Sequence, residues 1–395
     1  MIKRKEKIVY IIIVVCVAVA MIIVAGFNFL QSPAPQGQET SEMVDEGEDH
    51  QVSLASATVN SASVQHIQTP EEVRGFYWTA YTAGIDRADE LTDYMIETGL
   101  NAVVIDTKMD DGEIAFAPHN QDLAAYALDN PVIDDLEGLL EKLGEQNIYR
   151  IARIPVMRDA TFATVHPEVA LRTWGGGYWY DDIGSVWVDP AAPEVAEYAI
   201  ALAQEVYARG FDEVQFDYVR FASDGAISAI QYPVYDGVEE KFEVMYRFFQ
   251  SVGGTMRDEG IPVSFDTFGI TCWSGDDFNI GQRLVDVLPF ADYVSPMVYP
   301  SHFPDGFRGY ADPNQYPYEI VGRSMEECVN LASGIYKGSI EELQPRFRPW
   351  IQDFDIGAVY TADLIEAQIQ GARDAGSSGW ILWNARNVYE PANYQ

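Results

Sequence analysis

The chain has few residues of the kinds that metal and redox centres need. Its 395 residues include three cysteines and five histidines. The spacing of Cys16, Cys272 and Cys328 suggests no metal site, and at most one disulfide can form outside the membrane segment described below. No histidine stands in a His-x-His or His-Glu-x-x-His arrangement. We therefore predict no zinc and no cofactor, and the many acidic residues leave calcium as an alternative.

Patterns of other common enzyme classes are also missing. There is no serine nucleophile elbow and no cysteine–histidine pair. The triple glycine Gly175-Gly176-Gly177 matches no phosphate-binding loop, so nothing indicates a nucleotide.

Positive charge is scarce, with 25 basic against 61 acidic residues and a net charge of −36. The first 70 residues hold seven acidic and four basic residues, so residues 71–395 alone carry a charge of −33. Such a field repels nucleic acid and anionic lipid, and it accommodates a neutral or cationic partner more easily. A solubility adaptation to saline or alkaline surroundings is the alternative reading of the same charge.

One long apolar run occurs at the amino terminus, over residues 8–25, after Lys3, Arg4, Lys5 and Lys7. Its length and the flanking charge predict a transmembrane signal anchor within residues 1–30, with a cytoplasmic amino terminus. The sequence Ala18-Val19-Ala20 leaves a cleaved signal peptide as the alternative. Residues 31–70, with six acidic residues and no Lys or Arg, predict a disordered linker. We therefore expect a single-pass protein of the cell membrane with an extracellular catalytic domain.

Residues 71–395 contain eight short runs of β-branched, aromatic and aliphatic residues, each separated from the next by room for a helix. The runs are residues 74–81, 102–108, 149–156, 213–220, 262–269, 292–299, 346–354 and 379–386. This arrangement predicts an α/β fold, a (β/α)8 or TIM barrel, as one domain over residues 71–395.

Helices between the runs are predicted from their period and their ends. Two apolar stripes at helical spacing are Val195, Ala199, Leu202, Val206 and Val238, Phe242, Met245, Phe249, Val252. Gly99, Gly210 and Gly260 follow predicted helices, where a left-handed residue ends the helix. The links into the strands are short. By contrast, the segments that follow the strands are long, so function is expected on that rim of the barrel.

The fourth predicted strand carries an inward-pointing acid near its upper end. Period two puts Val214, Phe216 and Tyr218 under the helices and Asp217 inside the barrel, where a carboxylate is costly unless paired or used. Arg220 is the nearest candidate for a bidentate ion pair that holds Asp217 ionised. A purely structural ion pair is the alternative.

Three other predicted strands also end in acids. The fifth strand carries Asp266, the seventh ends with Asp353, and the second ends with Asp106 and Lys108 on one face. A single such Asp is often a loop cap, but four on one rim predict a site. Asp106 and Lys108 could form a buried structural ion pair or could bind the substrate, and the sequence does not separate these alternatives.

Polar and aromatic residues at the same rim suit a sugar ring. Tyr299 and His302 follow the sixth strand, and Trp383 and Asn384 close the eighth. They offer hydroxyl-bonding groups and a flat apolar face. The third loop could add a platform through Trp174, Tyr178, Trp179 and Trp187. Paired carboxylates beside such a surface are typical of glycoside hydrolysis, in which one acid protonates the leaving oxygen and the other attacks or activates water.

From Arg74 to Tyr389 the chain resembles the DUF4015 family, a family of bacterial glycoside hydrolases first described as a domain of unknown function. The segments that carry the resemblance are residues 100–108, 210–221, 295–302, 348–352 and 379–384. The resemblance implies a TIM barrel of the glycosidase superfamily. The chain departs from the family pattern on the rim, where Ala222 follows Phe221 in place of proline and Arg158 stands in place of lysine.

The fourth strand is also similar to the acidic motif of chitinases, but Val219 occupies the position of its glutamate, which disfavours that mechanism. A layout like that of α-amylases fits better: Asp217 as nucleophile or base, Asp266 as general acid and Asp353 as transition-state stabiliser. In the α-amylase layout the acid on the fifth strand is a glutamate, whereas this chain has Asp266 there.

We therefore predict a membrane-tethered glycosidase that acts on a polysaccharide or cell-wall glycan. The alternatives are a catalytically inactive glycan-binding barrel at the cell surface and a lyase or transglycosylase that shares the site.

Overall fold

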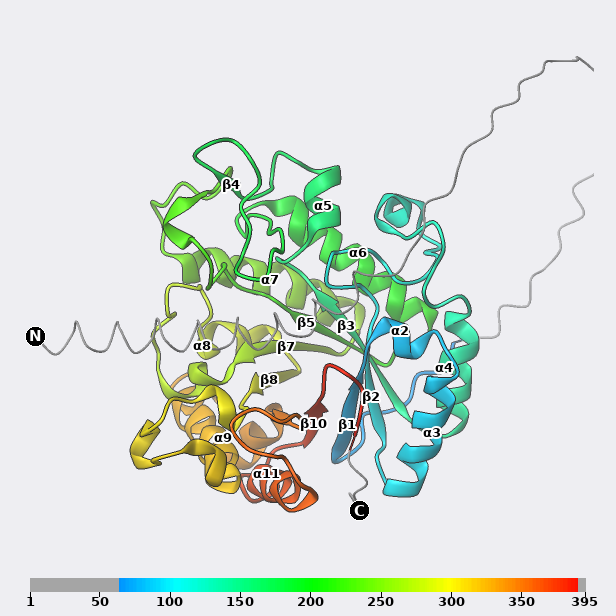
Figure 1. Ribbon diagram of the computed structural model, residues 1–395, viewed down its shortest axis with the longest axis vertical. Helices are drawn as coiled ribbons and strands as arrows, with labels where there is room; N and C mark the ends of the chain where they lie inside the picture. The colour runs from blue at the N-terminus through cyan, green and yellow to red at the C-terminus, as the bar shows by residue number, and fades with distance from the viewer. Residues whose placement is uncertain (1–63, 390–395) are drawn as a thin grey trace, which may run out of the picture.

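The computed structural model describes residues 64–389 of the chain (Figure 1). Eight parallel strands form a closed barrel in the order β1-β10-β9-β8-β7-β5-β3-β2. They are β1 (Val73–Trp78), β2 (Ala102–Asp106), β3 (Tyr149–Pro155), β5 (Glu213–Asp217), β7 (Val263–Phe268), β8 (Tyr293–Met297), β9 (Trp350–Gln352) and β10 (Gly379–Trp383). Each predicted run overlaps one of these strands, so the predicted TIM barrel is confirmed.

Helices surround the barrel in Figure 1. The α-helices are α2 (Ala80–Ala83), α3 (Arg87–Thr98), α4 (Leu136–Glu145), α5 (Ala160–Val165), α6 (Pro193–Arg209), α7 (Lys241–Glu259), α8 (Leu284–Val287), α9 (Pro317–Ser333), α10 (Ile340–Leu343) and α11 (Ala362–Asp374). Short 3-10 helices are η1 (Gln121–Tyr126), η2 (Ile227–Ala229), η3 (Gly269–Trp273), η4 (Leu288–Phe290), η5 (Pro300–His302), η6 (Phe307–Gly309), η7 (Pro313–Gln315) and η8 (Gln344–Arg346).

The helical stripes are confirmed except that Val238 lies outside its helix and Phe242 is only half-buried. All four stripe residues of α6 are buried. Helix α7 begins at Lys241, because Glu240 and Glu243 form a reciprocal capping box at that point. Val238 therefore precedes the helix and is 86% exposed, and its assignment to the stripe was wrong. The three predicted glycine ends all have positive φ angles, 84°, 121° and 72° along the chain.

The barrel interior is filled by a small apolar cluster and by polar side chains. The cluster consists of Val73, Tyr77, Ala102, Val104, Tyr149, Ile151, Tyr299, Trp350 and Ile381. Val214 and Phe216 belong to the larger core that includes residues of the helices, as predicted. Tyr218 packs against that core as well but is only partly buried, because β5 ends at Asp217 and the backbone then turns to φ 53°.

The amino-terminal end of the barrel is covered by residues 64–70. Ile67 N donates to Asp212 Oδ1 over 2.6 Å, and Thr69 Oγ1 lies 3.0 Å from Tyr149 OH. The chain therefore enters the barrel at the end opposite the long loops. The predicted membrane span lies outside the described residues, and no helix within residues 64–389 is long and apolar enough to cross a membrane.

Two connections that hold the long loops in place were not predicted. Strands β4 (Arg172–Thr173) and β6 (Ile230–Gln231) form an antiparallel pair that joins the loops after β3 and β5. A disulfide between Cys272 and Cys328 links η3, directly after β7, to α9. The loop that follows Asp266 is thereby fixed to the outer helix layer.

Removal of this disulfide should lower the stability of the barrel. The bond closes a sequence separation of 56 residues, for which the chain-entropy model gives about 4 kcal/mol. We expect the Cys272→Ser/Cys328→Ser variant to lose roughly that free energy of unfolding in urea titrations, whereas Cys16→Ser should match the wild type. Equal unfolding midpoints for the double variant and the wild type under oxidising conditions would contradict this.

Candidate active site

Asp217 lies at the carboxyl end of β5 with both carboxylate oxygens occupied. Arg153 of β3 donates to Oδ2 through Nη2 (2.5 Å) and Nε (3.1 Å). The backbone N–H of Tyr218 donates to Oδ1 over 2.6 Å. Asp217 and Arg153 are both more than nine-tenths buried. The guanidinium thus compensates a carboxylate that would otherwise be costly to bury.

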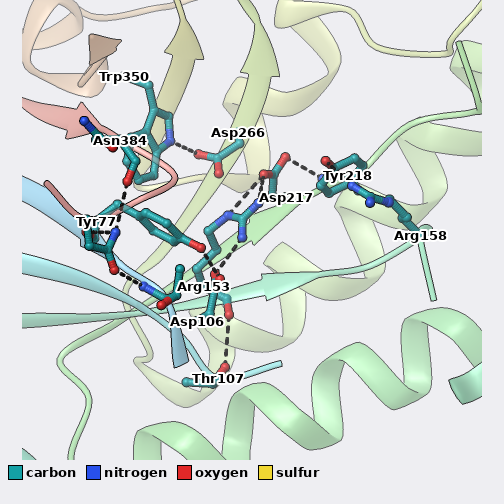
Figure 2. Close-up of polar contacts among 12 residues, drawn as sticks. Tyr77, Asp106, Thr107, Arg153, Arg158, Asp217, Tyr218, Asp266, Trp350 and Asn384 are labelled. Atoms are coloured by element: carbon teal, nitrogen blue, oxygen red, sulfur yellow. Dashed lines mark hydrogen bonds and ion pairs between the residues drawn. The ribbon is translucent and has the colours of Figure 1, made fainter. Parts of the chain in front are cut away.

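The same guanidinium also binds Asp106 on the other neighbouring strand. Arg153 Nη1 donates to Asp106 Oδ1 over 2.6 Å, and Tyr77 OH donates to Asp106 Oδ2 (Figure 2). Burial raises the pKa of Asp106 to about 6, against the opposing effect of Arg153. Arg153 therefore joins β2, β3 and β5 through one side chain.

Asp266 faces Asp217 from the next strand. Gln215 pairs with Ser264 and Phe216 with Phe265, so the register brings Asp217 and Asp266 to adjacent positions. Trp350 Nε1 donates to Asp266 Oδ1 over 2.8 Å, as Figure 2 shows, whereas Oδ2 is buried without a hydrogen-bond partner among the described residues. Burial and the nearby Asp217 carboxylate raise the pKa of Asp266 well above its ordinary value. Asp266 is thus suited to hold a proton.

Two predicted ion pairs are wrong. Arg220 does not pair with Asp217, because Arg153 from the adjacent strand already occupies that carboxylate. Lys108 does not pair with Asp106 either. Its Nζ lies 2.5 Å from Asp159 Oδ2, and both side chains are buried below the rim. Since Asp159 also accepts from Phe162 N at the start of α5, this pair fixes the loops after β2 and β3.

Asp353 is buried at the end of β9, and its backbone contacts lead toward β10. Its N–H donates to Trp383 O, and its carbonyl accepts from Asn384 Nδ2. Strand β8 separates β9 from β7, so the structure groups Asp266 with Asp217 more closely than with Asp353. Asn384 Nδ2 also donates to Val388 O over 2.6 Å, so its side chain orders the loop after β10.

The aromatic residues predicted at the rim are brought together on one side of the site. Trp383 packs on Tyr77 at 4.2 Å between ring centroids, and its ring lies 5.4 Å from the Arg153 guanidinium carbon. Tyr299 is buried, and burial together with Asp266 raises its pKa well above the ordinary value. His302 packs edge-on against Tyr299 and Phe354, and its Nδ1 lies 3.0 Å from Ser301 Oγ.

The predicted platform of the third loop is largely structural. Trp179 and Trp187 are each 1% exposed, with their indole N–H groups bound to Ala226 O and Asp181 Oδ2. Trp174 remains 77% exposed at the tip of the glycine turn. The buried pair therefore anchors the loop and offers no face to a sugar.

Sequence reasoning missed Arg153, Tyr77 and Trp350, which contact the carboxylates directly. A signal for Arg153 was available, because it shares the inward face of β3 with Tyr149 and Ile151 at period two. An inward arginine in a barrel strand predicts an inward acid beside it.

Tyr218, directly after Asp217, carries a φ of 53°. Such backbone geometry is costly for a bulky residue and is often found at functional sites.

Among residues 64–389, no group of three or more His, Cys, Asp or Glu side chains converges as a metal ion would require. A separate surface hollow lies at the opposite end of the barrel. Its lining includes Arg257, Asp292, Tyr293, Tyr336 and Lys337. None of the predicted site residues lines that hollow.

Residues 75–389 match the model of the DUF4015 family, described as "Putative glycosyl hydrolase domain". No protein of curated function matches the chain. Among solved structures, the glycoside hydrolase domain of PgaB (BpsB) from Bordetella bronchiseptica is 15% identical, with 79% of this chain and 94% of that chain covered and a TM-score of 0.53. That likeness supports the fold.

Two further solved structures are similar to the chain. A hypothetical protein from Ruminiclostridium thermocellum ATCC 27405 is 28% identical, with 48% of this chain and 96% of that chain covered and a TM-score of 0.43. The glycoside hydrolase domain of PelA from Pseudomonas aeruginosa is 13% identical, with 80% and 98% covered and a TM-score of 0.44.

His302 should make the protein less stable in acid. Burial lowers the pKa of His302 to about 4, below the ordinary value of 6.5. The folded state therefore binds the proton more weakly than the unfolded state, so this contribution is complete above pH 6.5 and is lost as the pH falls toward 4. Because solvent reaches part of the ring, we expect a loss of about 1–2 kcal/mol.

The measurement is the free energy of unfolding in urea at several pH values for the wild type and His302→Asn. The wild type should lose this extra stability between pH 6.5 and pH 4. Parallel curves for the two proteins would show that the imidazole does not titrate in this way.

Proposed function

The chain belongs to the DUF4015 family of glycosyl hydrolase domains, and from this premise we propose that it hydrolyses a polysaccharide or cell-envelope glycan at the Asp217–Asp266 pair. The observation that supports this most is the contrast between the two carboxyl groups. They occupy adjacent positions on β5 and β7, yet one is bound to a guanidinium and the other keeps an unpartnered buried oxygen among the described residues. Glycosidases need one carboxyl group that holds a proton and one that does not.

In the proposed mechanism, Asp266 is the general acid. Its raised pKa keeps the proton that must pass to the glycosidic oxygen as the bond to the anomeric carbon breaks. Trp350 fixes Oδ1 through its indole N–H, so the proton is held on the side of Oδ2. After cleavage, the Asp266 carboxylate can accept a proton from the incoming water.

Asp217 is the proposed nucleophile or base. Arg153 and the Tyr218 N–H hold its two oxygens in place, so little reorganisation is needed as charge develops at the anomeric carbon. The partly exposed Trp383 ring packs on the buried Tyr77 ring near Arg153 and supplies an apolar surface for a sugar. Asp353 stays in this proposal as a stabiliser of the transition state that acts from the end of β9, beside Asn384. Tyr299 and His302 stay in it as contacts for the sugar.

A catalytically inactive glycan-binding barrel is the second candidate, and one observation favours it. Arg153 places two N–H groups on a single oxygen of Asp217 and a third on Asp106, so the guanidinium neutralises much of the negative charge at the site. A nucleophile bound this tightly is weakened. Measurable glycan binding with no released reducing ends over a broad panel of glycans would support this candidate.

Asp266→Asn should lose activity in a way that depends on the leaving group. Without the general acid, we expect cleavage of glycans to fall on the order of 10³-fold, but cleavage of aryl glycosides with acidic phenols much less, because such phenols leave without a proton. Asp217→Asn should lose both activities, and Asp363→Asn, an exposed acid on α11, should lose neither. Rates measured as released reducing ends and released phenol provide the comparison.

If Asp266→Asn reduces both rates equally, Asp266 is not the acid. Unchanged turnover of Asp217→Asn would remove Asp217 from its proposed role.

We further propose that the barrel is held at the outer face of the cell membrane by residues 8–25. The sequence of that segment supports this, and so does the Cys272–Cys328 disulfide, since such bonds persist mainly outside the cytoplasm. The protein should sediment with membranes and be degraded by protease added to intact cells. Recovery in the culture medium would favour the cleaved signal peptide, and protection from protease would contradict an extracellular barrel.

A further inference from the structure

One buried arginine at the rim has no carboxylate within ion-pair distance among the residues that the structure describes. Five arginines within residues 64–389 are at least nine-tenths buried as whole residues: Arg150, Arg153, Arg158, Arg220 and Arg348. Four of them lie within 4.0 Å of an Asp or Glu oxygen. Arg220 does not, although the barrel is rich in acids. A buried guanidinium without a counter-ion is costly, so this exception calls for a physical explanation.

The Arg220 guanidinium is held firmly by uncharged groups. Nη1 donates to Phe221 O (3.1 Å) and to Ser223 Oγ (2.9 Å). The rings of Phe268 and Trp187 lie 4.5 and 4.9 Å from the guanidinium carbon. These contacts fix the plane of the group before any ligand arrives, which lowers the entropic cost of binding.

Part of the same guanidinium is left open. Nε and Nη2 of Arg220 donate to no acceptor among the described residues, and neither is among the atoms closed off from solvent. These two N–H groups form one edge of the planar fork that binds a carboxylate through two parallel hydrogen bonds.

Arg220 lies close to the proposed catalytic pair. Arg220 is three residues after Asp217, and it packs on Phe268, the last residue of β7, the strand that carries Asp266. It therefore lies between the ends of the two strands that supply the catalytic carboxyl groups.

A second buried guanidinium lies close by. The guanidinium carbons of Arg158 and Arg220 lie 5.1 and 5.5 Å from the centroid of the same Tyr218 ring. Arg158 donates through Nη1 to Tyr218 OH and through Nε to Ser185 Oγ, and its Nη2 has no acceptor among the described residues. Its contact with Asp181 is long, at 3.8 Å. The rim thus carries two positive groups with unused donors next to the same tyrosine ring.

We propose that Arg220, with Arg158 beside it, binds a carboxylate carried by a sugar next to the cleaved bond. The substrate is then an acidic glycan whose sugar bears a carboxyl group, either on the ring as in a uronic acid or on a lactyl ether. This inference rests on the proposed glycosidase function. Asp217 does not compete for Arg220, because Arg153 already binds it. Asp224, the other acid near Arg220, accepts instead from Ser223 Oγ.

The acidic surface does not prevent such binding. Charges separated by more than about 8 Å are largely screened at physiological ionic strength. A carboxylate that reaches the Arg220 fork exchanges water for two charge-assisted hydrogen bonds in a site that is largely desolvated.

The experiment compares matched glycans that differ only in the carboxyl group. One pair is a uronic-acid oligosaccharide and its carboxyl-reduced form, and the other is a lactyl-ether (muramic) oligosaccharide and its carboxyl-reduced form. We expect the wild type to prefer the carboxylated member of one pair by about 10²-fold in kcat/KM. The pair that shows this preference tells whether the carboxylate belongs to a uronic acid or to a lactyl ether. Arg220→Gln should remove this preference, and Arg323→Gln, an exposed arginine on α9, should keep it.

A wild type that cleaves both members of each pair equally would overturn the inference and leave the glycosidase function standing. A preference that survives in Arg220→Gln would also overturn it. If Arg220→Gln does not fold, Arg220→Lys replaces it, since lysine keeps the charge without the fork and should reduce the preference several-fold.

If no glycan is cleaved, the proposed glycosidase function is rejected, whether or not Arg220 binds a carboxylate. Calorimetric binding of the same pairs to the wild type and to Arg220→Gln then tests the carboxylate site directly. Equal affinity of the wild type for both members of each pair would reject it.

Discussion

The site depends on one guanidinium that lies between two carboxylates inside the barrel. Arg153 extends from β3 to Asp106 on β2 and to Asp217 on β5, so a single side chain binds the acids of both neighbouring strands. Two acids at this depth would repel each other and each would lose its hydration. With the arginine between them, both can be buried at the carboxyl ends of the strands. Loss of Arg153 alone would leave two uncompensated buried groups, which commonly costs 3–5 kcal/mol.

The same interaction separates the properties of Asp217 and Asp266. Arg153 donates two hydrogen bonds to Asp217, whereas the group that donates to Asp266 is the neutral Trp350 indole. A buried acid without a bound cation retains its proton, and the adjacent Asp217 carboxylate reinforces this. Two chemically identical side chains on neighbouring strands thus acquire the opposite tendencies that acid–base catalysis requires, because β3 borders β5 and does not border β7.

The sequence predicted the barrel well and the contacts of the site poorly. All eight strands and the inward position of Asp217 follow from the period and spacing of the apolar residues, which can be read from short stretches of the sequence. The partner of Asp217 does not follow. Arg220 was chosen because it is near in the sequence, but in a parallel barrel a side chain meets its neighbours across strands, and Arg153 is 64 residues away. Lys108 was paired with Asp106 for the same reason and instead binds Asp159.

Burial alone does not distinguish the structural acids from the functional ones. Glu213 and Asp217 both point inward from β5 and both are buried. Glu213, at the amino end of the strand, accepts from Arg348 and Ser264 on one oxygen and from Tyr149 on the other. Asp266, at the opposite end, keeps Oδ2 without a partner among the described residues. An unsatisfied buried oxygen carries a free-energy cost that packing does not explain, and its position at the loop end of a TIM barrel supports the proposed catalytic role of Asp266.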